Sequence, residues 1–314
     1  MMKERLLKNL NQWFRARNDK GNSQTFGSRN SYILPSSFGW LYAFVLITLF
    51  TGAINYQISL IFLLVFLLAL IGIGSAWEAQ ANLKGLSVKL LAIDDAEVGQ
   101  AVCINLLISP NNKLRYALEF QVGKQAAIGL EQTSLNEFRM VLPLSTDRRG
   151  YFKLPTIKIY TLYPLGLFKT WGYLYFDEGF YVYPQPVFPG FWPAPITVQS
   201  NNQVALVGDN EFYDLRQVEN PWAQPNLIAW KIVAKDQGWH VKTMDSSAGN
   251  YWLFQLSDLP FDDLEKKLQY LSFWLQNAEV NQDLYSLKLG RFTTPLSHGK
   301  QHLQQCLRQL AICS

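Results

Sequence analysis

The side chains best suited to chemistry gather in residues 209–245, DNEFYDLRQVENPWAQPNLIAWKIVAKDQGWHVKTMD. Arginine and lysine beside carboxylates and tryptophans can build an active site, a docking surface, or a packed seam between two domains. An exposed tryptophan near basic groups has the composition of a protein-binding hot spot, and Trp222, between two prolines, suits exposure better than Trp230. The seam stays open as the alternative. The candidate interaction surface comprises Glu211, Arg216, Trp222, Trp230, Lys231 and Lys235.

Signatures of catalysis are missing from the sequence. It contains no G-x-S-x-G, no phosphate-binding G-x-x-x-x-G-K-[ST] and no H-E-x-x-H. His298 and His302 have the spacing of two zinc ligands, but no third ligand is evident. Asp262, Asp263 and Glu265 stand at the start of an expected helix, where acids stabilise the helix dipole. The sequence therefore predicts a non-catalytic protein with no metal ion and no cofactor.

Charge is unevenly distributed along the 314 residues. Residues 1–30 carry seven Lys or Arg and two acids, which leaves 21 basic and 22 acidic residues for the rest. A nucleic-acid-binding protein needs its positive field on the folded domain, so this class is not expected. Three widely spaced cysteines form no disulfide framework and indicate a reducing compartment.

An uncharged run of 48 residues extends from Asn30 to Trp77. A bilayer is crossed by about 20 apolar residues, and this run holds two such segments, Phe38–Ile54 and Ile58–Trp77. Both are expected to be helices, because lipid offers backbone groups no hydrogen-bond partners. The sequence predicts a transmembrane hairpin over residues 37–77. A signal peptide fits less well, since the apolar region is doubled and no cleavage site stands out.

The bias of Lys and Arg predicts the orientation of this hairpin. The segment before it is basic, Lys84 and Lys89 follow it, and the turn between its helices has no charge. Both termini and the folded domains are therefore expected in the cytoplasm. Residues 1–17 form either a disordered basic tail or a helix lying on anionic headgroups. In the second case the membrane-surface anchors are Lys3, Arg5, Lys8, Trp13, Arg15 and Arg17.

Short β-prone segments fill residues 86–183. They are separated by turn residues, with no helical pattern between them. This arrangement predicts an immunoglobulin-like β-sandwich without a disulfide. The predicted strands are LSVKLLAI, AVCINLLIS, YALEFQV, EFRMVLPL, YFKLPTIKIYT and FYVYP.

The C-terminal part alternates strands and helices. Strands are predicted at 240–245, 251–258 and 284–290, with amphipathic helices at 260–280 and 298–312. Such an order implies a small α/β layer.

Two stretches hold an ordered series of motifs: residues 147–187, which read DRRGYFKL, then YPLGLF and YVYP, and residues 211–231, with Glu211-Phe212, Leu215-Arg216 and Ile228-x-Trp230-Lys231. They resemble the series R-G-x-Y, P-x-G-L-F, V-Y-P, E-F-x-x-L-R and I-x-W-K of one bacterial membrane family, the domain of unknown function 58 family. The resemblance implies a bacterial inner membrane as the location. Members are often encoded beside a MoxR-type AAA+ ATPase. The resemblance implies such an ATPase, or a neighbouring membrane protein, as the partner.

The chain departs from this family at two places. A central Gly-Asp and Arg of the family fall on Trp222-Ala223 and near Asn226. Longer members carry a von Willebrand A-type domain with a metal site D-x-S-x-S, but here the place reads Gln255-x-Ser257-x-Leu259. The resemblance thus implies a reduced von Willebrand A-type layer without its metal site.

These predictions combine into an α+β multidomain protein. Its parts are a basic cytoplasmic tail (1–36), a transmembrane hairpin (37–77), a β-sandwich (78–190) and an α/β domain (191–314). The predicted function is that of a membrane-anchored interaction or scaffold protein. An envelope enzyme with an unrecognised, hydrolase-like site and a sensor of lipid surfaces remain the alternatives.

Overall fold

The computed structural model describes residues 21–193, 213–217, 240–244 and 251–313, the two short segments by their backbone alone. The chain divides into two compact units, and the division falls between Gln185 and Pro186. This point lies close to the boundary predicted after residue 190.

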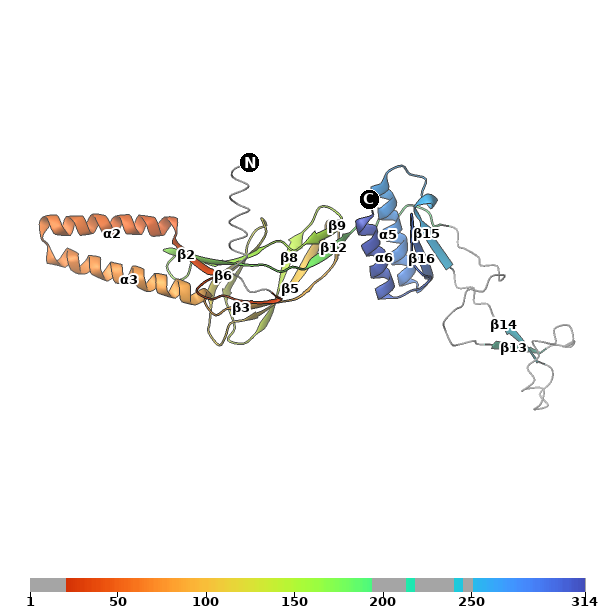
Figure 1. Cartoon of the computed structure of the whole chain (residues 1–314), viewed down its shortest axis with the longest axis horizontal. Coiled ribbons are helices and arrows are strands. Elements are labelled where there is room, and N and C mark those ends of the chain that lie inside the picture. Colours follow the sequence, from red (N-terminus) through yellow and green to blue (C-terminus); the bar gives the residue numbers. More distant parts are fainter. Residues whose placement is uncertain (1–20, 194–212, 218–239, 245–250, 314) are drawn as a thin grey trace. The chain divides into compact units, whose positions relative to one another are not determined.

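The first unit is mostly β-sheet and carries a helical hairpin (Figure 1). Two antiparallel sheets make up most of it. A small third sheet contains one parallel and one antiparallel strand pair. In spatial order, the first sheet is β1 (Ser23–Thr25), β3 (Ser87–Ile93), β5 (Ala101–Ser109) and β8 (Phe138–Ser145). The second is β2 (Ser31–Pro35), β11 (Phe168–Leu174), β10 (Ile157–Thr161), β6 (Tyr116–Val122) and β7 (Ile128–Gln132). The third is β4 (Ala96–Glu97), β12 (Gly179–Tyr183) and β9 (Gly150–Lys153).

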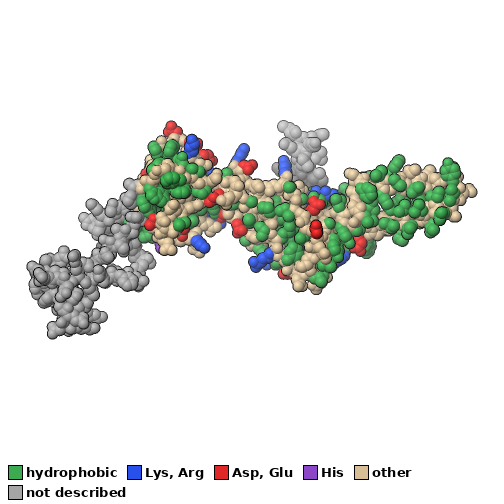
Figure 2. Space-filling model, turned by 180° about the vertical axis from the view of Figure 1, so that it is seen from behind, with side chains coloured by type: hydrophobic (Ala, Val, Ile, Leu, Met, Phe, Trp, Pro, Cys, Tyr) green, Lys and Arg blue, Asp and Glu red, His purple; other side chains and the backbone are tan. Residues whose placement is uncertain are grey.

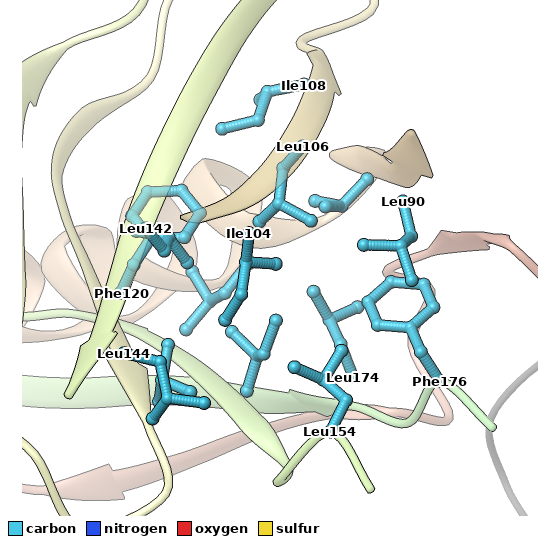
Figure 3. Close-up of a cluster of buried hydrophobic side chains, with 14 of the residues drawn as sticks. Leu90, Ile104, Leu106, Ile108, Phe120, Leu142, Leu144, Leu154, Leu174 and Phe176 are labelled. Atoms are coloured by element: carbon cyan, nitrogen blue, oxygen red, sulfur yellow. The ribbon is translucent and has the colours of Figure 1, made fainter. Parts of the chain in front are cut away.

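Alternating side chains place the hydrophobic core between the two larger sheets. Every second residue of β5 is buried, from Val102 to Ile108, because successive side chains of a strand point to opposite faces. These residues join Phe120 of β6 and Leu174 of β11 in one hydrophobic cluster (Figure 3). The predicted strands at 101–109 and 116–122 are confirmed with the same bounds.

Two long apolar helices form the hairpin, α2 (Ser37–Tyr56) and α3 (Ser59–Leu83). They lie side by side and are joined by a turn in which Gln57 has a positive φ of 53°. The turn is placed where the sequence predicts it. However, α3 continues six residues past the predicted end at Trp77, and its last turn joins the β-sheet part of the unit.

The structure differs from the predicted 1–36 tail. Residues 23–35 are part of the fold: β1 pairs with β3, and β2 pairs with β11. The buried Gln24 fixes this segment further, since its side-chain amide bonds both the carbonyl and the N–H of Tyr175. The hairpin is therefore an insertion between strands of the same sheets, and we call the unit without its hairpin the β domain.

The second unit contains a parallel strand pair and two helices. β15 (Tyr251–Gln255) pairs with β16 (Leu284–Leu289) in parallel, and β17 (Phe292–Thr293) continues the sheet antiparallel to β16. Between β15 and β16 lie a 3-10 turn, η3 (Leu256–Asp258), and α5 (Leu264–Val280), and α6 (Lys300–Ile312) follows β17. The predicted α/β order is confirmed. Asp263 begins α5 as expected of an acid there, its Oδ1 accepting the Glu265 N–H at 3.0 Å.

A separate antiparallel strand pair lies earlier in this unit. β13 (Tyr213–Gln217) pairs with β14 (His240–Met244), with Arg216 opposite Val241. The predicted strand at 240–245 is thus present over 240–244.

Candidate functional site

The hairpin exposes apolar side chains along its length. Both helices are long and apolar enough to cross a membrane, and only 11% and 17% of their most apolar windows are buried. A core helix of a soluble protein would be mostly buried instead. On the face seen in Figure 2, hydrophobic side chains cover the hairpin, and Phe44, Ile47, Leu63 and Leu70 are each about two-thirds exposed. Exposed apolar surface of this extent marks a site of interaction with a membrane or another protein.

The two helices of the hairpin contact each other through small and aromatic residues. Ala53 and Val65 are buried in the seam, and the rings of Phe50 and Phe62 meet edge to face at 6.1 Å. Near the β domain, the Tyr42 hydroxyl donates to the Leu68 carbonyl at 2.5 Å. These contacts fix the register of the helices.

The start of α2 is bonded to the β10–β11 loop of the β domain. Ser36 caps the helix, since its Oγ accepts the Gly39 N–H at 3.0 Å. The same hydroxyl donates to the Gly166 carbonyl, and the Ser36 N–H donates to the Leu167 carbonyl at 2.8 Å. A Cβ on Gly39 would clash with that Leu167 carbonyl, so only glycine fits there. The loop is the P-L-G-L-F stretch (164–168) of the sequence resemblance.

The end of α3 is capped by the buried Arg115. Its guanidinium donates to the carbonyls of Ala81, Asn82 and Lys84 at 3.0, 2.8 and 2.6 Å, and to that of Pro110 at 3.1 Å. The last carbonyls of a helix lack partners within it, and a cation there also balances the helix dipole. Burial lowers the pKa of Arg115 below its ordinary value.

Asn82 joins the same helix end to two strands. Its side-chain amide donates to the Tyr116 carbonyl at 2.7 Å and to the Thr161 hydroxyl at 3.2 Å, and its Oδ1 accepts the Tyr116 N–H at 3.0 Å. The amide thus pairs with β6 as another strand would. Both ends of the hairpin are therefore held by hydrogen bonds to the β domain, which are part-buried at Ser36 and include buried ones at Asn82 and Arg115.

A second surface of interest is the outer face of the β2–β11–β10–β6–β7 sheet. Tyr32 and Trp171 pack there with ring centroids 5.9 Å apart, and the Lys169 ammonium lies 4.1 Å from the Tyr160 ring centroid. A hydrogen bond to the Glu119 carboxylate raises the pKa of Tyr160 to about 12. Half-buried Tyr, Trp and Lys on one face form a composition suited to binding another protein.

A cysteine and a histidine approach each other in the second unit. Cys306 Sγ lies 3.8 Å from His302 Nε2, while that nitrogen lies 3.1 Å from the Tyr285 carbonyl. Both side chains are buried, and burial raises the pKa of the Cys306 thiol to about 11. A nucleophilic cysteine needs a lowered pKa and access to substrate, so this pair is a packing contact.

The two histidines with the spacing of zinc ligands lie in different surroundings. His302 is engaged with Tyr285, whereas His298 is exposed. Among the residues that the structure describes, no group of three His, Cys, Asp or Glu could hold a metal ion. In the described β domain, a cleft of about 290 Å³ is lined by residues that include Asn111, Leu135 and Glu137.

Most of the predicted site residues lie outside the described part of the chain. This holds for Glu211, Trp222, Trp230, Lys231 and Lys235, while Arg216 lies in β13, of which only the backbone is described. It also holds for the six membrane-surface anchors within residues 1–20. Their predicted roles stay predictions.

The residues that hold the hairpin are not among those predicted from sequence. Ser36 followed by Gly39 before an apolar run is a recognisable helix start. Arg115, in the turn sequence NNKLRY, and Asn82, at a helix end, carry no comparable signal, because their roles depend on contacts distant in sequence.

In comparisons with protein-family models, with curated proteins and with solved structures, nothing matches this chain. The resemblance to the domain of unknown function 58 family rests on the sequence motifs alone.

Proposed function

We propose that this protein is a membrane-anchored, non-catalytic interaction protein. The observation that carries the proposal is the apolar hairpin, largely exposed and held at both ends by the β domain. In water, such an apolar surface would associate with other apolar surfaces. In a bilayer it contacts lipid chains, and the backbone groups of the hairpin are already hydrogen-bonded within the helices.

The strand pairing supports a topology with two membrane crossings. β2 precedes the hairpin and pairs with β11, which follows it, so the two flanks belong on one side of the membrane. The excess of Lys and Arg near this side favours the cytoplasm of a bacterial cell. The uncharged turn around Gln57 would then reach the opposite side.

The partner and the finer fold are proposed from the sequence motifs. We take the β domain as immunoglobulin-like and the second unit as a reduced von Willebrand A-type layer. A MoxR-type AAA+ ATPase, or a neighbouring membrane protein, is the proposed partner. The outer sheet face around Tyr32, Tyr160 and Trp171 and the segment around Trp222 are the two candidate docking surfaces.

Replacing the hairpin tests the anchoring. Ser36 bonds to the Leu167 carbonyl of the β domain, and the buried Ala79 directly follows Glu78, so a short Gly/Ser linker between Ser36 and Glu78 is designed to leave every strand in place. We expect the full chain to stay in the membrane fraction after alkaline extraction and the linker variant to be soluble and folded. A full-length chain that is extracted as a soluble protein would contradict the anchoring.

Capture of the partner tests the interaction role. The full-length protein, gently solubilised, is expected to retain an AAA+ ATPase identified by mass spectrometry. Trp171→Ala and the pair Trp222→Ala with Arg216→Ala separate the two candidate surfaces, and Arg139→Ala on exposed β8 is the matched control. Absence of any ATPase would refute this partner and return weight to a hydrolase-like enzyme or a lipid-surface sensor.

A further inference from the structure

The position of the bilayer along α3 follows from its sequence. From Leu60 to Trp77 the helix has no charged residue, and Glu78 is the first. At 1.5 Å per residue this stretch spans about 27 Å, close to the ~30 Å of a bilayer's hydrocarbon. The remaining turn, with Ala79, Asn82 and Leu83 buried, belongs to the β domain. The hydrocarbon boundary on this side therefore lies near Trp77.

The contacts between the two helices of the hairpin indicate which residue of α2 lies level with this boundary. Phe50 lies opposite Phe62, and Tyr42 reaches Leu68 and packs near Gly72. In an antiparallel pair, each step back along α2 matches a step forward along α3. Ser36 is thus about level with Trp77, at the same boundary.

The β10–β11 loop is held at this level. The loop runs from Leu162 to Leu167, and Ser36 bonds directly to its carbonyls. It is a compact turn, closed by a hydrogen bond of 2.8 Å from the Gly166 N–H to the Leu162 carbonyl. Its position relative to the boundary is fixed by bonds and does not depend on a long linker.

Two leucines of this loop point away from the core. Leu162 is 39% exposed and Leu165 is 51% exposed, whereas Leu167 is buried. Leu34 of β2, which bonds across to Lys169 of β11, adds a third exposed leucine beside the start of α2. These side chains form an apolar rim at the level where the chain would enter lipid.

Charged residues of both signs surround the same end of the β domain. The loops that join the strand ends there contain the exposed Arg29, Lys84 and Lys113, and the exposed acids are Glu137, Glu78 at the end of α3 and Glu131 near the end of β7. The three basic side chains can meet anionic headgroups at a membrane surface, so the apolar rim carries the argument and the charges support it only locally.

We infer that the β10–β11 loop is a third membrane contact, with Leu162 and Leu165 inserted among the lipid headgroups of the bilayer that the hairpin spans. This inference rests on the proposed membrane anchoring. Its consequence is that the β domain keeps one orientation to the bilayer, so the outer face around Trp171 is always presented in the same direction.

Spin labels on single introduced cysteines of the full-length protein, in which the buried Cys306 is retained, test this contact. In a Cys103→Ser, Cys313→Ser background, labels are placed by Leu165→Cys, by Ile47→Cys within α2, and by Lys124→Cys in the exposed loop between β6 and β7. The protein is inserted into vesicles of phosphatidylethanolamine and phosphatidylglycerol. Collisions with apolar oxygen and with a water-soluble nickel complex then report the depth of each label.

Three patterns are distinguished. A label at Leu165→Cys that is protected from nickel and accessible to oxygen supports the contact. In this pattern the label at Ile47→Cys lies deeper and the label at Lys124→Cys lies in water. Leu165→Cys as open to nickel as Lys124→Cys, with Ile47→Cys still deep, overturns it and leaves the anchoring intact. Ile47→Cys in water overturns both. If the loop contacts the membrane, the double substitution Leu162→Gln, Leu165→Gln should reduce the protection of a label at Leu34→Cys from the nickel complex. If the loop lies in water, the double substitution should leave that protection unchanged.

Discussion

At the scale of single residues, Arg115 has the largest structural role in the junction. It satisfies carbonyls at the end of α3 that no backbone group reaches. Arg115→Leu should lower the free energy of unfolding by about 2–4 kcal/mol, because hydrogen bonds to a charged group are lost and buried carbonyls are left unpaired. Thermal and denaturant unfolding in detergent micelles measure this.

Two further variants make the Arg115 prediction specific. Arg115→Lys should recover only part of the loss, since one ammonium cannot reach the same set of carbonyls. Arg139→Ala, at an exposed position of β8, should change little. An Arg115→Leu protein as stable as the control would show that the helix end is held by other contacts.

Cys306 gives a prediction about alkaline pH. Burial raises its thiol pKa from an ordinary 9.0 to about 11, so the folded state binds the proton more tightly than the unfolded state does. The stabilisation is present below pH 9 and is lost as pH rises from 9 to 11, by about 3 kcal/mol at most. The free energy of unfolding measured from pH 9 to 10 should therefore depend less steeply on pH in Cys306→Ala than in Cys103→Ala.

The reactivity of the same thiols is a simple companion test. In the folded protein at neutral pH, a maleimide reagent should modify the half-buried Cys103 before the buried Cys306. Fast modification of Cys306 would contradict its assignment as a packing residue and reopen the contact with His302 as a reactive pair.

At the scale of elements, the contact between α2 and the β10–β11 loop depends on Gly39. A methyl group there would clash with the Leu167 carbonyl, so Gly39→Ala should move the helix start and cost about 1–3 kcal/mol. Gly52→Ala in the same helix is the matched control, because a Cβ there meets no atom within 4 Å. Unfolding in micelles compares the two variants. Equal stability would mean that the loop yields easily, and it would weaken the case for a fixed loop position.

Elements differ in how far their sequences predict them. β5 alternates buried and half-buried residues over nine positions, and such a pattern is visible without a structure. β1 and β2 are short, and they stand before the hairpin among polar residues, so nothing local indicates that they pair with β3 and β11. β11 contains Gly172, and a glycine is required there because Phe26 packs where a Cβ would be.

The hairpin itself is predictable because its length and lack of charge are local properties. Its attachment is not, since Ser36, Asn82 and Arg115 act through partners far along the chain. The predicted interaction surface around Trp222 lies outside the described residues. The prediction of that interaction surface therefore rests on amino-acid composition alone.

At the scale of the whole molecule, the fold imposes a rule on topology. Strands on both sides of the hairpin share sheets, so any membrane that the hairpin enters must leave residues 23–35 and the strands after Leu83 on one side. A single crossing would require these strand pairs to break. For an inserted hairpin, these strand pairs therefore allow two crossings and one exposed turn.

Cysteine accessibility in cells tests this claim most directly. Ser23→Cys, Lys124→Cys and Tyr56→Cys, each in the Cys103→Ser, Cys313→Ser background, place a thiol before the hairpin, after it and at its turn. A membrane-impermeant maleimide should label only the Tyr56→Cys protein in spheroplasts, and only the Ser23→Cys and Lys124→Cys proteins in inverted membrane vesicles. Labelling of Ser23→Cys and Lys124→Cys from opposite sides would contradict the two-crossing topology, and labelling of all three from one side would contradict insertion.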